Sequence, residues 1–154
     1  MKIDEFKFNI TYNIFNIFLI LIMKKVKSCG CIIIENNKVV LVQQKKGNWG
    51  FPKGRVEKNE TECETAIREV KEETNLDVII EDANKKYIDT YLTKIDKPKE
   101  VVFFIGKRIG GEIKPQEKEI KNVEWVDLLE AINRITMKST KLLYQKVLAE
   151  EELI

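Results

Sequence analysis

The 154-residue sequence contains no histidine and only three cysteines. Without histidine, Ser-His-Asp and Cys-His nucleophilic sites are excluded, and so are most zinc sites. The cysteines, Cys29, Cys31 and Cys63, have neither a zinc-site spacing nor the even number of a disulfide framework. They are predicted to be small buried residues in a reducing cytoplasm. Any chemistry in this chain must therefore be carried by carboxylates.

A strong net charge of either sign is also absent. The 27 lysines and arginines are balanced by 25 acidic residues, which gives a formal net charge of +2. This balance argues against bulk electrostatic binding, and no stable nucleic-acid partner is expected. The glutamates are nevertheless unevenly distributed. Several fall within one short stretch and indicate a cation site: Glu57, Glu60, Glu62, Glu64, Glu69, Glu72 and Glu73.

The sequence has no apolar run long enough to cross a membrane. Residues 14–23 contain a single polar residue, Asn16, but a membrane span needs roughly 20 apolar residues. Residues 1–22 form an apolar extension with three open interpretations. It is an element packed on the domain, a dispensable leader before Met23, or a weak anchor. We expect residues 23–154 to form one cytoplasmic, monomeric domain, and membrane association is not expected.

The pattern of apolar residues and breakers predicts a mixed α/β layered domain. Two strand-like runs, 29–34 and 39–43, flank the pair Asn36-Asn37 and predict a hairpin. Glycines and a proline predict an irregular loop over residues 45–56. Further strands are expected at 76–80, 86–93, 101–107 and 123–126, and helices at 127–135 and 140–152.

A helix is predicted after this loop. Thr61 and Glu64 have the spacing of a capping box. Glu69, Glu72 and Glu73 share one helical face, beside an apolar stripe. Like charges at this spacing repel each other, so they require a compensating cation, which we expect to be Mg²⁺ or Mn²⁺. The apolar stripe consists of Cys63, Ala66, Ile67 and Val70.

The segment from Gly54 to Leu76 resembles the Nudix box, G-x5-E-x7-R-E-U-x-E-E-x-G-U, in which U is aliphatic. Every defined position matches except the last glycine, which is Asn75. That glycine follows a helix end where a left-handed backbone is needed, and asparagine is the usual second choice. We therefore expect a small stability cost and retained catalysis. The chain is similar to Nudix hydrolases, which implies an α/β fold with a mixed β-sheet sandwiched between helices.

The resemblance implies a pyrophosphohydrolase that uses a divalent cation. Glu69, Glu72 and Glu73 would be metal ligands, because Mg²⁺ and Mn²⁺ prefer carboxylate oxygens. The Gly54 carbonyl would be a further ligand, and Arg68 would orient a helix carboxylate through a bidentate pair. The metal would neutralise phosphate oxygens and lower the pKa of a bound water.

Other segments resemble the asymmetrical diadenosine tetraphosphate hydrolases within this family, namely residues 49–54, residues 97–99 and Glu119 ahead of residues 124–126. This likeness implies that Tyr91 stacks on adenine, that Lys53 and Lys99 hold phosphates, and that Glu119 faces the metals as a ligand or base. Sheet packing for Tyr91 and plain surface positions for the other three residues remain open.

The combined expectation is an enzyme that binds a nucleotide substrate and hydrolyses diadenosine tetraphosphate to ATP and AMP. Two alternatives share the same fold: an RNA 5′-pyrophosphohydrolase, and an enzyme that removes unwanted nucleoside triphosphates. A third alternative is a nucleotide-sensing module without activity, since a fold does not determine a function. The full set of box carboxylates argues against the sensor.

Overall fold

The computed structural model describes residues 10–18 and 26–154. Residues 10–18 form a short helix whose apolar side chains are largely exposed, for example Ile14 and Phe15. No helix in the described residues has the length and apolar character needed to cross a bilayer. The rest of the predicted extension lies outside the described residues, so its three interpretations remain predictions.

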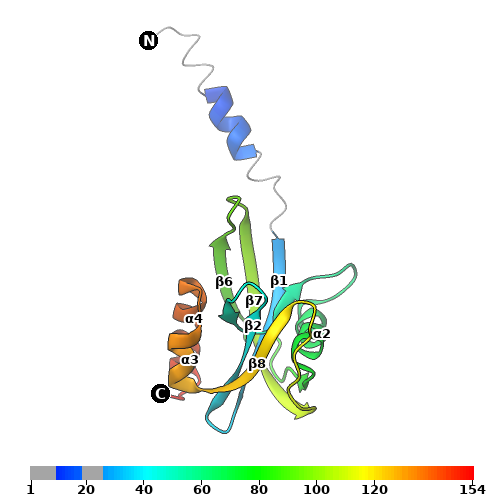
Figure 1. Ribbon diagram of the computed structural model, residues 1–154. Coiled ribbons are helices and arrows are strands. Elements are labelled where there is room, and N and C mark those ends of the chain that lie inside the picture. The colour runs from blue at the N-terminus through cyan, green and yellow to red at the C-terminus, as the bar shows by residue number, and fades with distance from the viewer. Residues whose placement is uncertain (1–9, 19–25) are drawn as a thin grey trace.

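The domain is built on an eight-stranded mixed sheet (Figure 1). Its two central strands, Val26–Glu35 and Pro98–Gly110, are parallel, and their paired residues run from Val26↔Lys99 to Ile33↔Gly106. All other strand pairs are antiparallel. The strands of the described residues are β1 (Val26–Glu35), β2 (Lys38–Gln44), β3 (Trp49–Gly50), β4 (Lys53–Arg55), β5 (Asp77–Ile79), β6 (Tyr87–Leu92), β7 (Pro98–Gly110) and β8 (Ile120–Asp127).

The hairpin between β1 and β2 is confirmed. Asn36 and Asn37 both have positive φ, 50° and 60°, as tight hairpin turns require. The expectation of an irregular loop over residues 45–56 is partly wrong, because β3 and β4 lie within it. Both strands are too short to produce a periodic pattern in the sequence. They are held by pairing with β2 and β1.

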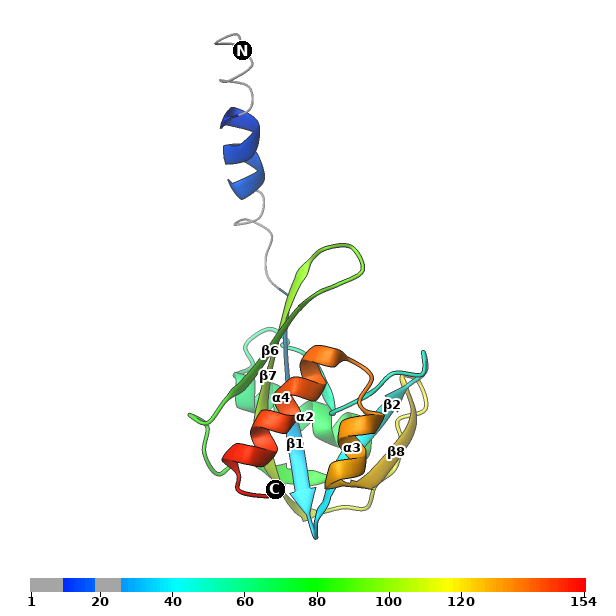
Figure 2. The same cartoon turned by 90° about the vertical axis from the view of Figure 1, so that its left-hand side faces the viewer.

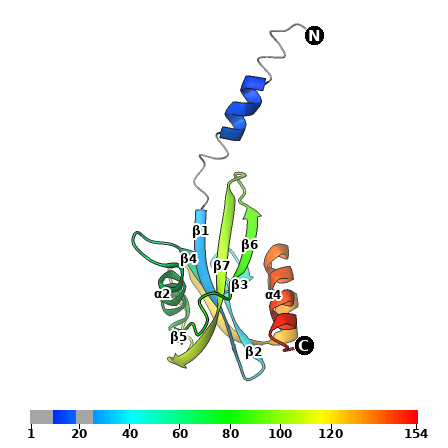
Figure 3. The ribbon, with the colours of Figure 1, turned by 180° about the vertical axis from the view of Figure 1, so that it is seen from behind.

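Helices cover both faces of the sheet, which confirms the predicted α/β/α sandwich. Helix α2 (Glu62–Thr74) packs on one face, while α3 (Leu128–Arg134) and α4 (Lys138–Glu150) pack on the other (Figures 2 and 3). Alternating side chains of β1 supply the two cores. Cys31 and Ile33 join the core beneath α2, and Ile32 joins the core beneath α3 and α4. The two cores hold α2 and β4 in fixed positions.

Helix α2 begins with the predicted capping box, in which Thr61 and Glu64 each accept a backbone N–H of the other. Asn75 follows its last residue, and its φ of 65° confirms the left-handed backbone expected there. The predicted apolar stripe needs correction, because Ile67 is 36% exposed whereas Glu73 is only 6% exposed. Glu73 therefore belongs to the buried face of α2 rather than beside it.

Candidate functional site

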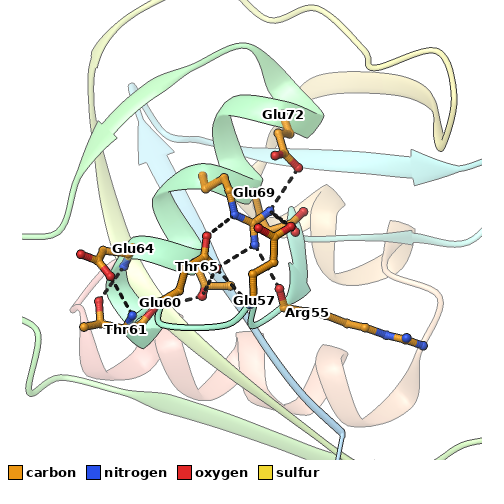
Figure 4. Close-up of polar contacts among 9 residues, drawn as sticks. Arg55, Glu57, Glu60, Thr61, Glu64, Thr65, Glu69 and Glu72 are labelled. Carbon is orange, nitrogen blue, oxygen red and sulfur yellow. Dashed lines mark hydrogen bonds and ion pairs between the residues drawn. The ribbon is translucent and has the colours of Figure 1, made fainter.

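Arg68 of α2 forms hydrogen bonds with three of the acidic side chains labelled in Figure 4, namely Glu60, Glu69 and Glu72. Its guanidinium makes a bidentate pair with Glu60, at 2.5 and 2.9 Å. It also donates to Glu69 at 2.7 Å, to Glu72 at 3.2 Å and to the carbonyl of Arg55 at 3.0 Å. The predicted bidentate pair thus exists, but its partner is the loop carboxylate Glu60 and not a helix carboxylate. The Arg68 hydrogen bond, ahead of other causes, lowers the pKa of Glu60 to about 2.

Glu69 lies directly against the backbone of β4. A Cβ added to Gly54 would be 2.0 Å from the carboxyl carbon of Glu69, so any residue other than glycine would displace that carboxylate. The Glu69 side chain is 12% exposed. Burial raises its pKa, and the neighbouring Arg68 opposes this shift. Gly54 is therefore required by contact with Glu69, whether or not its carbonyl binds a metal.

Glu73 is the most deeply buried carboxylate of the box. It accepts the backbone N–H of Lys53 at 3.2 Å, and no salt bridge to it is found within the described residues. Burial raises its pKa to about 8, and the charges of Glu69 and Glu119 act in the same direction. An ionised carboxylate here is poorly solvated, so a cation would stabilise it.

The other two predicted acids lie nearer to solvent. The side chain of Glu72 is 48% exposed and contacts Arg68. Glu119 is an exposed residue of the turn before β8, and its charge raises the pKa of both Glu69 and Glu73. The structure thus brings Glu69, Glu72, Glu73 and Glu119 close enough for their charges to interact, and the proximity of Glu119 agrees with what the family resemblance implies.

These carboxylates fit a hard divalent cation by donor type, since they supply oxygens of like charge, and those of Glu69 and Glu73 are largely withdrawn from solvent. They do not converge, however: the described residues contain no group of three acidic, cysteine or histidine side chains placed to hold a metal. Arg68 explains this spacing, because one of its nitrogens donates to both Glu69 and Glu72. Binding a cation at those two oxygens requires Arg68 to release them. Its bonds to Glu60 and to the Arg55 carbonyl can persist.

A cationic cluster lies on the other side of β4. Lys53 and Arg55, two residues apart on this strand, share one face. Burial is the main cause that lowers the pKa of Lys99 to about 8, and the nearby charges of Lys53 and Arg55 act in the same direction. Lys99 is paired with Tyr91 across β6 and β7, and its ammonium lies 5.9 Å from the centre of the tyrosine ring. No ion pair to Lys53, Arg55 or Lys99 occurs within the described residues.

Three cations held together, with no ion pair to a carboxylate in the part of the chain that the structure describes, indicate an anion-binding surface. The predicted residues Lys53, Lys99 and Tyr91 are brought together, and Arg55 is a member that the sequence reasoning missed. In a strand, residues two apart share one face, so Arg55 could have been placed beside Lys53. The expected irregular loop over residues 45–56 gave no such face. Strand β4 thus lies between two groups of opposite charge. Its Gly54 contacts Glu69 of α2, while the charges of Lys53 and Arg55 act on Lys99, and the charge of Lys53 also reaches Glu73.

The chain matches the NUDIX domain family over residues 24–145. It is 34% identical over 125 residues to Nudix hydrolase 2 of Arabidopsis thaliana, which covers 74% of this chain and 43% of that protein. It is 36% identical over 115 residues to the m7GpppN-mRNA hydrolase dcap-2 of Caenorhabditis elegans, covering 65% of this chain and 13% of the relative. The chain therefore spans less than half the length of either protein.

Two further relatives are matched over nearly their whole length. The asymmetrical bis(5′-nucleosyl)-tetraphosphatase of Sus scrofa is 28% identical, with 78% of this chain and 91% of the relative covered. The crystal structure of a C. elegans Ap4A hydrolase binary complex superposes with a TM-score of 0.72 at 27% identity, covering 84% of this chain and 99% of the other. With the box helix, the sandwich fold and the family match in agreement, this chain belongs to the Nudix hydrolase family.

Proposed function

We propose that this Nudix hydrolase is a divalent-metal-dependent enzyme that cuts diadenosine tetraphosphate asymmetrically into ATP and AMP. The observation that carries the proposal is the pair of opposite surfaces on β4. Buried carboxylates with raised pKa lie on one side, and three cations that form no ion pair with the described residues lie on the other. A polyphosphate with several negative charges and a bound cation complements both surfaces.

Glu69, Glu72 and Glu73, with the Gly54 carbonyl, would hold Mg²⁺ or Mn²⁺. When bound, such an ion neutralises phosphate oxygens and activates a water molecule at neutral pH. The protein must then provide two adjustments. Arg68 turns away from Glu69 and Glu72 while keeping Glu60, and Glu73 loses its proton. Glu119, exposed and close enough to influence both buried acids, is the candidate for accepting a proton from water.

Lys53, Arg55 and Lys99 would hold the phosphate chain as positive charges. Tyr91 is half-buried beside Lys99 and would stack on one adenine. Stacking contributes about 1–3 kcal/mol per base, which is enough to fix one nucleoside. A substrate anchored at one end presents one particular phosphorus to the carboxylate site. This favours an asymmetric cut over a symmetric one.

The experiment is a product analysis by ion-exchange chromatography, with diadenosine tetraphosphate, nucleoside triphosphates and triphosphorylated or capped RNA as parallel substrates. We expect the dinucleotide to be preferred, with equal amounts of ATP and AMP. In heavy-oxygen water, one labelled oxygen should appear in only one product, because the attacking water adds its oxygen to the phosphorus that it strikes. Two molecules of ADP, or preference for an RNA substrate, would overturn the substrate assignment.

A further inference from the structure

A groove of about 580 Å³ is lined by residues of strand β6 and helix α4. Helix α4 lies on the face of the sheet opposite α2 (Figure 3). Its walls include Tyr87, Leu142 and Leu143, and its polar lining includes Asp89 and Ser139. Ligand pockets of this size usually combine apolar walls with a few placed polar groups. None of these residues belongs to the acidic helix or to the cationic cluster.

The polar lining has unused hydrogen-bonding capacity. Asp89 is only 4% exposed, and its Oδ2 accepts the hydroxyl of Thr140 at 2.6 Å. Within the described residues no hydrogen bond reaches its Oδ1, and the buried Ser139 hydroxyl oxygen has no partner. Leaving a buried polar group such as the Ser139 hydroxyl without a partner is costly, so an unpartnered group in a groove points to a ligand that satisfies it. Besides Asp89 and Ser139, the polar lining of the groove includes Lys86, Thr90 and Lys146.

The groove adjoins the proposed stacking residue. Asp89 and Tyr91 lie two residues apart on the same face of β6, which separates their Cα atoms by about 7 Å. Burial is the main cause that raises the pKa of Tyr91, and the nearby charge of Asp89 is the second. A purine placed near the Tyr91 ring, with its phosphates toward Lys99, therefore has its polar edge within reach of the groove lining.

We propose that Asp89 and Ser139 select adenine by reading its amino edge, an inference that rests on the proposed function. Adenine presents an amino donor beside a ring-nitrogen acceptor. The free Oδ1 of Asp89 accepts from the amino group, and the Ser139 hydroxyl donates to the ring nitrogen. Hypoxanthine presents a carbonyl oxygen in place of the amino group and so faces Asp89 with a second acceptor. Guanine carries the same carbonyl at that position.

The test compares diadenosine tetraphosphate with diinosine tetraphosphate, which differ only at this edge. We expect wild-type kcat/KM to favour the adenine substrate by about 10- to 100-fold, as for one hydrogen bond to a charged group. Asp89→Asn can present an amide donor and should abolish or invert the preference. Ser139→Ala should reduce it. The exposed Gln145, on the same helix and outside the groove lining, supplies the control Gln145→Ala, which should keep the wild-type ratio.

The ratio is measured on one protein preparation, so loss of folded protein in a variant affects both substrates equally. Equal use of the two dinucleotides by the wild type, or an unchanged ratio in Asp89→Asn, overturns base reading and leaves the proposed function intact. If neither dinucleotide is cut, the proposed function fails instead. Calorimetric titration of ATP and ITP into the full chain then decides the inference, because equal affinities overturn it and tighter ATP binding supports it.

Discussion

Gly54 and Glu69 are in direct contact across β4 and α2, with no room for a side chain between them. We therefore expect Gly54→Ala to displace the Glu69 carboxylate and the strand. The expected cost is about 1–3 kcal/mol of unfolding free energy, as in other overpacked sites, together with a large loss of turnover. Thermal denaturation and steady-state kinetics measure the two effects.

Gly50 provides the matched control for this substitution. It lies in β3, the strand that precedes β4 in the sequence, and a Cβ there would meet no described atom within 4 Å. Gly50→Ala should leave both stability and turnover close to wild type. A Gly54→Ala protein as active and as stable as Gly50→Ala would show that the contact with Glu69 has no consequence.

Glu72→Gln tests the helix carboxylates without disturbing the core, because the side chain is half exposed. A neutral amide is a poor ligand for Mg²⁺, so turnover should fall by several powers of ten while the melting temperature stays unchanged. Glu57 is the control, since it also approaches Arg68, at 3.8 Å, but is 66% exposed and outside the defined box positions. Near-normal turnover in Glu72→Gln, matching that of Glu57→Gln, would remove Glu72 from the site.

The buried Glu73 should make the metal-free protein less stable as pH rises. Its pKa is raised to about 8, so the folded state binds a proton that the unfolded state releases near its ordinary value. Stability therefore falls between about pH 4.5 and pH 8 and levels off above. Glu73→Gln removes this loss and should be more stable than wild type at pH 9 in the presence of a chelator, by a few kcal/mol at most.

Unfolding curves across this pH range, for the two proteins in parallel, provide the measurement. Mg²⁺ should stabilise the wild type by mass action and the Glu73→Gln protein much less. Parallel pH profiles for the two proteins would mean that Glu73 is not held in an unfavourable charged state.

The lowered pKa of Lys99 predicts a pH dependence of substrate binding. Burial and the charges of Lys53 and Arg55 lower its pKa to about 8, so it loses its charge as pH rises through that value. The KM for a polyphosphate substrate should therefore increase between pH 7 and pH 9. Arginine stays protonated over this range, and Lys99→Arg should give a flatter profile. Identical slopes in the two proteins would exclude Lys99 from phosphate binding.

Local signals in the sequence predicted much of this arrangement. The paired asparagines of the hairpin, the capping box at Thr61 and the left-handed Asn75 each depend on neighbouring residues alone. The box pattern also named residues that the structure holds in contact, since Arg68 bonds to Glu60, Glu69 and Glu72. These features depend on spacing along one segment, which is what a single sequence records.

The remaining features depend on contacts between distant segments. The burial of Glu73 follows from β4 lying over α2, and β4 exists only through its pairing with β1. The preference of Arg68 for Glu60 depends on how the loop folds back over the helix. Arg55 and Asp89 acquire their neighbours from β7 and α4 respectively. No periodicity within one element could reveal these contacts.

Tyr91 has two possible roles, base stacking and packing in the sheet, because it lies beside Lys99 and also packs against the core beneath α4. If it stacks on adenine, Tyr91→Ala should raise KM by an amount equivalent to about 1–3 kcal/mol, with little change in kcat. Tyr91→Phe keeps the aromatic face and should preserve KM. If the ring only packs, Tyr91→Ala should instead lower the melting temperature while KM stays constant. Steady-state kinetics and thermal denaturation on the three proteins therefore separate the two roles, and an unchanged KM in Tyr91→Ala would remove the base-stacking contact from the proposed substrate site.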